Sequence, residues 1–143
     1  MARLILDTSG YLVSINPRHP DRDAVRRVLA SVDEPPVLSP MVLAEIDYMV
    51  LTRLGVDQET AVIDELTGGA YDLAELDVDD ICLGRDLIAR YRDLKIGLTD
   101  AVNVVLADRY ATNEVLTTDQ RHFRAVTPLS RRHDAFRVLP VDL

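Results

Sequence analysis

Short apolar runs, each bounded by polar or turn-forming residues, recur along the chain. Runs of this length are typical of strands that are buried inside a sheet. One further segment, 71–74, is predicted to be an edge strand. The predicted strands span 4–6, 37–38, 71–74, 115–117 and 137–139.

Between these runs, apolar residues recur at helical spacing, and capping signals mark the helix ends. The clearest helix, 40–54, follows the hydroxyl N-cap Ser39, has Pro40 at its first position and is stopped by Gly55. The other predicted helices span 9–15, 21–31, 57–66, 79–92 and 99 to about 112, and 118–123 is predicted to be a short turn or helix.

Strands that alternate with helices predict β-α-β units and a parallel sheet. We therefore predict an α/β fold with a short central parallel sheet flanked by helices. The length of 143 residues suits one domain spanning 1–143. The hydrophobic share of 48% is enough for a packed core, which excludes a disordered chain.

Hydropathy also argues against a membrane protein. The sequence has no stretch approaching the ~20 uninterrupted apolar residues of a membrane span. The first seven residues, 1–7, lack the long apolar segment of a signal peptide. We therefore expect a cytoplasmic protein with no membrane partner.

The charge balance narrows the function classes. Sixteen basic and twenty-four acidic side chains give a net charge of −8, which argues against general coating of duplex DNA by a broad basic surface. It does not exclude a nuclease, because metal-binding nucleases carry carboxylate clusters. The one cysteine, Cys82, excludes a disulfide framework and a cysteine-based zinc site, and we expect it to be a small core residue.

Four acidic residues stand out by position. Asp7 and Asp119 directly follow predicted strands, and in parallel sheets the chemistry gathers at the carboxyl ends of the strands. Glu45 lies among apolar neighbours inside a predicted helix, and Asp100 lies in the first turn of another. Singly, each has an ordinary explanation as a helix cap, a loop residue or an arginine partner. Asp47 also has apolar neighbours, so its helix does not single out Glu45.

Taken together, the four carboxylates indicate a site for a hard divalent cation. Mg²⁺ prefers oxygen ligands from a few carboxylates together with waters and substrate phosphates. Two such ions about 4 Å apart can activate a water and stabilise the leaving oxygen when a phosphodiester is hydrolysed. This chemistry needs carboxylates that converge from different elements, which two strand ends and two helices can supply.

The segments that carry these residues resemble, in order, the sequence blocks of PIN domains. They are Leu4-Ile5-Leu6-Asp7-Thr8-Ser9, Ser39-Pro40-Met41-Val42-Leu43-Ala44-Glu45, Gly97-Leu98-Thr99-Asp100-Ala101 and Leu116-Thr117-Thr118-Asp119-Gln120-Arg121-His122-Phe123. The resemblance covers essentially the whole chain, whose length is similar to that of single-domain VapC-type toxins. It implies a three-layer α/β/α domain and a Mg²⁺- or Mn²⁺-dependent endoribonuclease that cuts RNA, is neutralised by an antitoxin protein and is usually a homodimer.

The resemblance also assigns the site, residue by residue. By motif, Asp7, Glu45, Asp100 and Asp119 are the expected catalytic quartet, and all of them except Glu45 are the expected metal ligands. Two further residues are expected to support the site and two to contact the substrate. These are Thr117 and Asn103 for support, and Arg121 and His122 for the substrate.

Other α/β proteins with an aspartate at a strand end fit the sequence less well. A phosphoacceptor receiver domain needs paired acidic residues after its first strand, where this chain has Asp7 followed by Thr8. A haloacid-dehalogenase-type phosphatase needs a second aspartate at position 9, which is Ser9. The alternative that stays open is a PIN-like module that binds RNA or protein without catalysis, although such a module is expected to lose acidic residues.

Overall fold

The computed structural model describes residues 3–143. Met1 and Ala2, which belong to the predicted domain 1–143 and to the N-terminal segment 1–7, lie outside the described residues. The strands are β1 (Leu4–Leu6), β2 (Val37–Leu38), β3 (Asp72–Leu73), β4 (Glu114–Leu116) and β5 (Arg137–Leu139). The helices are α1 (Thr8–Ile15), α2 (Arg22–Ser31), α3 (Pro40–Leu54), α4 (Val56–Thr67), α5 (Val78–Arg90), the 3₁₀ helix η1 (Arg92–Leu94), α6 (Leu98–Arg109) and α7 (Gln120–Ala125).

The described strands form one parallel sheet with the order β3-β2-β1-β4-β5. The central strand is β1, in which Ile5 pairs with Val37 on one side and with Val115 on the other. Every residue of β1 is buried, which is why its sequence is continuously apolar. The chain-order reversal lies at β1, because β2 and β4 flank it on opposite sides.

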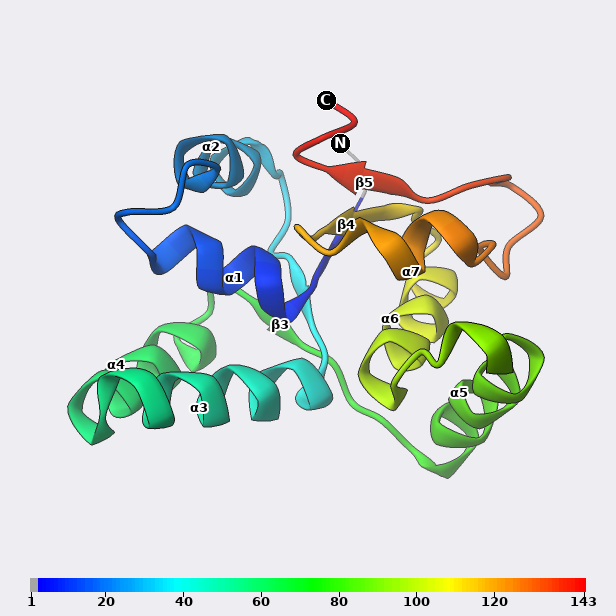
Figure 1. Ribbon diagram of the computed structural model, residues 1–143, viewed down its shortest axis with the longest axis horizontal. Coiled ribbons are helices and arrows are strands. Elements are labelled where there is room, and N and C mark those ends of the chain that lie inside the picture. Colours follow the sequence, from blue (N-terminus) through cyan, green and yellow to red (C-terminus); the bar gives the residue numbers. More distant parts are fainter. Residues whose placement is uncertain (1–2) are drawn as a thin grey trace.

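Helices cover both sides of the sheet (Figure 1), and alternate residues of β1 pack against different helical layers. Leu4 and Leu6 pack with residues of α1, α2, α3 and α4, whereas Ile5 packs with residues of α5, α6 and α7. The sheet is therefore the middle layer of three, and the predicted α/β/α architecture is confirmed. No helix within residues 3–143 combines the length and the apolar character that crossing a membrane requires.

Local sequence signals set several helix ends. The Ser39 hydroxyl accepts a hydrogen bond from the backbone N–H of Met41 at 3.1 Å, and Pro40 occupies the first turn of α3. Gly55, at the end of α3, has a φ of 89°, a conformation that a residue with a Cβ rarely adopts. These contacts involve near neighbours in sequence, so the ends of α3 could be predicted.

The structure shifts the bounds of most predicted elements by one to three residues, and three corrections have a clear physical reason. The strand predicted at 115–117 is Glu114–Leu116, because β1 ends opposite Leu116 and the chain then turns into α1. The helix predicted from 99 to about 112 is Leu98–Arg109, and the chain turns into β4 at Ala111, which has a φ of 51°. Cys82 is exposed rather than a core residue, because it lies on the outward side of α5.

Candidate active site

The carboxyl ends of β1 and β4 lie side by side, which brings Asp7 and Thr117 together. Each follows the last residue of its strand, and Leu6 pairs with Leu116 in the sheet. The close approach of α1 to this edge depends on Gly10, where an added Cβ would lie 2.4 Å from the backbone oxygen of Leu116. In open parallel sheets a ligand binds at this kind of edge, where the strand order reverses.

Asp7 is the buried centre of the site. Its side chain is 5% exposed, and it accepts hydrogen bonds from the Thr117 hydroxyl at 2.7 Å and from the Asn103 amide at 3.4 Å. Although Asp7 occupies the N-cap position of α1, its carboxylate makes no capping bond to that helix. Burial raises the pKa of Asp7 from 3.8 to about 6, and the nearby carboxylates of Asp100 and Glu45 add to the rise against the Thr117 bond.

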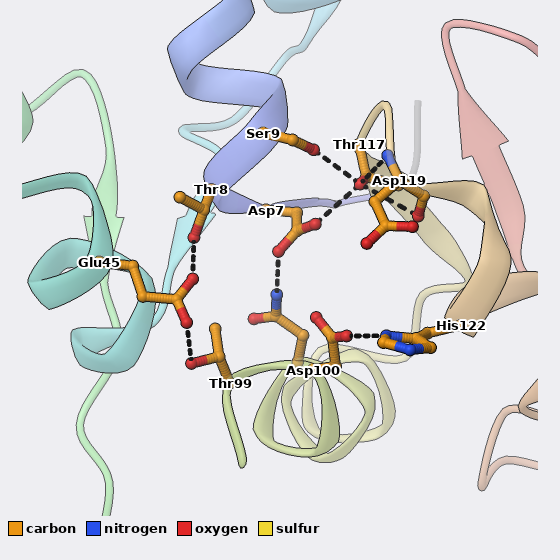
Figure 2. Close-up of polar contacts among 10 residues, drawn as sticks. Asp7, Thr8, Ser9, Glu45, Thr99, Asp100, Thr117, Asp119 and His122 are labelled. Atoms are coloured by element: carbon orange, nitrogen blue, oxygen red, sulfur yellow. Dashed lines mark hydrogen bonds and ion pairs between the residues drawn. The ribbon is translucent and has the colours of Figure 1, made fainter. Parts of the chain in front are cut away.

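A chain of hydroxyl groups leads to Asp7. The backbone N–H of Thr118 donates to the Ser9 hydroxyl at 3.0 Å, and the hydroxyl oxygens of Ser9 and Thr117 lie 2.9 Å apart. Since Thr117 gives its one proton to the Asp7 carboxylate, Ser9 must donate to Thr117. The resulting order, from Thr118 to Ser9 to Thr117 to Asp7, fixes the orientation of the buried carboxylate. Figure 2 shows its last two steps, from Ser9 to Thr117 and from Thr117 to Asp7.

Asp100 is held by a histidine. Its Oδ2 atom lies 2.5 Å from Nδ1 of His122, which comes from α7. Burial raises the pKa of Asp100, and Asp119 and Glu45 contribute to the rise, while the hydrogen bond from His122 opposes it. His122, predicted to contact the substrate, thus has one ring nitrogen bonded to Asp100, and its Nε2 atom is not part of this contact.

Glu45 reaches the site from α3 and is held by two hydroxyl groups. Oε1 accepts from Thr8 at 2.6 Å and Oε2 accepts from Thr99 at 2.7 Å. The sequence suggested that Glu45 lies in a buried apolar face, but the residue is exposed. Its neighbour Asp47 turns elsewhere and faces Glu59 of α4, where the Asp47 carboxylate raises the pKa of Glu59 by accepting a hydrogen bond from its protonated form.

The remaining members of the predicted set lie at the start of α7 and in α6. Asp119 is exposed, and its backbone N–H donates to the Thr117 hydroxyl at 3.0 Å. Arg121 is exposed at the second position of α7, for which Asp119 is the N-cap residue. Asn103 is completely buried in α6, and its Oδ1 atom has no hydrogen-bond partner among the described residues.

The four acidic residues line one cavity of about 340 Å³, which we call the acidic cavity. Figure 2 shows their carboxylates facing a common space between α1, α3, α6 and the loop after β4. The full lining consists of Asp7, Thr8, Ser9, Leu12, Glu45, Met49, Gly97, Thr99, Asp100 and Asp119.

The oxygen donors of the acidic cavity are of the kind that binds a hard divalent cation, although the carboxylates do not lie close enough together to bind one ion in this arrangement. Within residues 3–143, no three acidic, histidine or cysteine side chains lie close enough to form a metal site as they stand. The convergence of Asp7, Asp100 and Asp119 on one cation therefore stays a prediction for the metal-bound protein, because these side chains are farther apart in the present arrangement. Like charges repel, and Asp7 and Asp100 are each bonded to a neighbouring side chain. Asn103 donates its amide to Asp7 from α6 and does not itself line the cavity, so the donor set consists of carboxylate and hydroxyl oxygens.

Three site residues were not predicted from the sequence. Thr8 and Thr99 hold Glu45, and Ser9 lies next to Thr117. Each is a hydroxyl residue within two positions of Asp7 or Asp100, and that proximity was the available signal. Their partners lie 37, 54 and 108 positions away, so the sequence does not show which groups the hydroxyls contact.

Comparisons with known proteins agree with this fold. No protein-family model matches the chain. The chain is 44% identical over 137 residues to ribonuclease VapC26 of Mycobacterium tuberculosis, an alignment that covers 96% of this chain and all of the relative. The crystal structure of Mycobacterium tuberculosis VapC20, a toxin that cleaves the sarcin–ricin loop, superposes with a TM-score of 0.74 at 16% identity, covering 81% of this chain and 89% of that one. The structure of VapBC2 from Rickettsia felis, bound to a promoter DNA fragment, gives a TM-score of 0.69 at 17% identity, with 94% and 97% covered.

Proposed function

Since the chain belongs to the VapC family of ribonucleases, we propose that it is a Mg²⁺- or Mn²⁺-dependent endoribonuclease toxin that an antitoxin protein neutralises. The observation that carries the proposal is the acidic cavity, in which carboxylates from β1, α3, α6 and α7 face one space at the carboxyl edge of the sheet. Burial raises the pKa values of Asp7 and Asp100, and the repulsion between the carboxylates adds to the rise. A bound cation relieves that repulsion.

The residues have separate roles in this proposal. Asp7, Asp100 and Asp119 would hold the cation, with Glu45 beside them, and a cation held there would supply the Lewis acidity that activates a water for attack on an RNA phosphodiester. Thr117 orients Asp7 through its 2.7 Å bond, and Asn103 supports the same carboxylate from α6. The cation also offsets the negative field of a chain with net charge −8, so that an RNA phosphate can approach.

Substrate contacts fall to α7 in this proposal. Arg121 is exposed beside the acidic cavity and offers a guanidinium that can bind a phosphate through two hydrogen bonds. His122 holds Asp100 through Nδ1, which leaves Nε2 as the atom for a substrate contact.

The decisive experiment is to sequence RNA 5′ ends after brief induction of the wild type and of Asp7→Asn. We expect new 5′ ends at defined sites for the wild type and none for the variant. Asp47→Asn is the matched control, because Asp47 lies on the same helix as Glu45 but faces Glu59. Equal cleavage by the wild type and Asp7→Asn would refute the proposed mechanism and leave the acidic cavity as a binding site without catalysis.

The antitoxin is proposed to bind an apolar groove next to the acidic cavity. This groove, with a volume of about 400 Å³, runs between α1 and α3 and shares Ser9, Leu12 and Met49 with the cavity. A partner segment that buries apolar side chains there can extend a cationic residue to the carboxylates. An arginine suits them, because its guanidinium binds a carboxylate through two parallel hydrogen bonds.

This mode of inhibition has two separable parts. Burial in the groove sets the affinity, and the inserted cation competes with Mg²⁺. We would measure binding of an antitoxin peptide to the wild type and to Asp7→Asn across a Mg²⁺ titration. Affinity that changes with neither metal nor mutation would show that the antitoxin acts away from the acidic cavity.

A homodimer is the proposed assembly. On α3, Tyr48 is 66% exposed and Leu54 is 58% exposed, with Leu51 between them at 39%. Large exposed side chains of this kind on one helix are typical of a protein interface. Sedimentation at tens of micromolar, without antitoxin, is expected to give a dimer, and a monomer would refute this part of the proposal.

A further inference from the structure

Glu45 differs from the other three acids in how it is held. It is an exposed residue on α3, yet each of its two carboxylate oxygens accepts a short hydrogen bond from a different helix. The donor on α1 is Thr8 and the donor on α6 is Thr99. Because α1 and α3 pack on one face of the sheet and α6 on the other, the Thr8 bond lies within one helical layer and the Thr99 bond connects that layer to the opposite one at the carboxyl edge.

Without these bonds, the position of Glu45 would be unfavourable. A glutamate side chain at the surface has several rotamers, and its carboxylate is fully hydrated when it points into water. Here it faces Asp7 and Asp100, whose pKa values it helps to raise through repulsion. Something must therefore offset both the lost side-chain entropy and the repulsion. Two hydroxyl donors to an anion can do so, since hydrogen bonds to charged groups are stronger than those between neutral groups.

We propose that Thr8 and Thr99 are positioning residues that form a hydroxyl clamp, holding the Glu45 carboxylate at the acidic cavity so that it is preset for a divalent cation. The inference rests on the proposed function, because the clamp serves cation binding. It assigns no contact with the reacting atoms to either threonine. Each hydroxyl occupies one lone-pair site of its oxygen, and a carboxylate offers about four such sites, so the clamped Glu45 keeps acceptor capacity toward the cavity.

If Thr8 and Thr99 clamp Glu45, Mn²⁺ affinity depends on their hydroxyl groups and does not depend on their methyl groups. Thr8→Val and Thr99→Val remove the donor at nearly constant volume, whereas Thr8→Ser and Thr99→Ser keep it. The matched control is Thr52→Val, because Thr52 lies on α3 with its hydroxyl bonded to the backbone oxygen of Tyr48 at 2.9 Å. All variants are made in the full chain.

The first measurement is Mn²⁺ affinity by titration calorimetry without RNA. We expect each valine variant to bind Mn²⁺ about tenfold more weakly, which is the size expected for losing a hydrogen bond to a charged group. Both serine variants and Thr52→Val are expected to bind like the wild type. In a Glu45→Ala background, Thr8→Val and Thr99→Val should have no further effect on affinity, because the clamp then has nothing to hold.

The second measurement needs no metal. In excess chelator, the unfolding equilibrium constants of the wild type, Thr99→Val, Glu45→Ala and the double variant form a cycle, and a second cycle uses Thr8→Val. We expect the two substitutions in each cycle to be non-additive by several-fold, since clamp and carboxylate contact each other. Additive effects in both cycles would refute the proposed clamp, whatever the result of the Mn²⁺ titrations.

The two measurements separate the two proposals. A wild type that binds no Mn²⁺ would refute the metal-dependent function, while the chelator cycles would still decide whether the clamp exists. A wild type that binds Mn²⁺ alongside valine variants that bind it equally well would refute the positioning role and leave the proposed function standing.

Discussion

The amino edge and the carboxyl edge of the sheet differ in the partners that their acidic side chains have. At the amino edge, where the strands begin, acids pair with arginines: Arg3 bonds Asp72 at 2.7 Å and Glu34 at 3.0 Å, and Arg137 bonds Glu114 at 2.8 Å. At the carboxyl edge, Asp7 and Asp100 lie near other acids and are held by a hydroxyl, an amide and an imidazole.

The carboxylates at the amino edge stabilise the fold through ion pairs, whereas those at the carboxyl edge remain available to bind a ligand. An arginine partner satisfies a carboxylate and lowers its energy within the protein. A hydroxyl partner orients a carboxylate but leaves its charge uncompensated, so the site favours an added cation. Burial without a cationic partner, with a smaller contribution from the nearby carboxylates, raises the pKa of Asp7 to about 6. Four predictions test this difference between the two edges, from the largest expected effect to the smallest.

The largest effect is expected on RNA cleavage. Asp7→Asn removes a proposed metal ligand and should lower the cleavage rate by at least about 100-fold. Glu114→Gln, the matched change at the amino edge, should leave the rate close to that of the wild type. Quantitative 5′-end sequencing over a time course of induction measures both, and equal losses would mean that the two edges are not functionally distinct.

The same aspartate should reduce stability as the pH rises. Folding raises the pKa of Asp7 from 3.8 to about 6, so the folded protein binds the proton more tightly than the unfolded chain does. The resulting penalty is absent below pH 4, grows between pH 4 and 6, and then stays at roughly 3 kcal/mol. Urea unfolding in chelator should find Asp7→Asn more stable than the wild type by up to this amount at pH 7, with the two converging below pH 4. A constant difference at all pH values would contradict this assignment.

At the amino edge, removing the cation should destabilise the protein. Arg137→Met leaves Glu114, which is 7% exposed, as a buried charge whose Oε2 atom already lacks a partner among the described residues. We expect a loss of about 2 kcal/mol in the free energy of unfolding at pH 7. Chemical denaturation measures it, and the loss should shrink in Arg137→Met/Glu114→Gln, where the buried charge is gone.

The smallest effect is expected at an exposed ion pair on the same edge. Glu34 is 63% exposed where it meets Arg3, and pairs of this kind contribute little because water and salt screen them. Glu34→Gln should lower the free energy of unfolding by no more than about 0.5 kcal/mol. A loss as large as that of Arg137→Met would show that the amino edge acts as one network rather than as separate pairs.

The sequence by itself determined the elements that depend on near neighbours. The apolar run 4–6 predicted the buried central strand, and Ser39, Pro40 and Gly55 marked the ends of α3. These signals could be read because a cap or a strand end involves residues a few positions apart. The order and spacing of the four acidic motifs were enough to identify the family, since both can be read from the sequence alone.

Only the tertiary structure decided which groups meet. Glu45 and Asp47 have similar neighbours in sequence, but α3 turns Glu45 toward Thr8 and Thr99 and turns Asp47 toward Glu59. Cys82 looked like a core residue until the packing of α5 placed it outside. The hydroxyl partners of the acids come from segments 37 to 110 positions away. Such contacts depend on how helices of opposite layers pack at one edge of the sheet, and local periodicity carries no information about that packing.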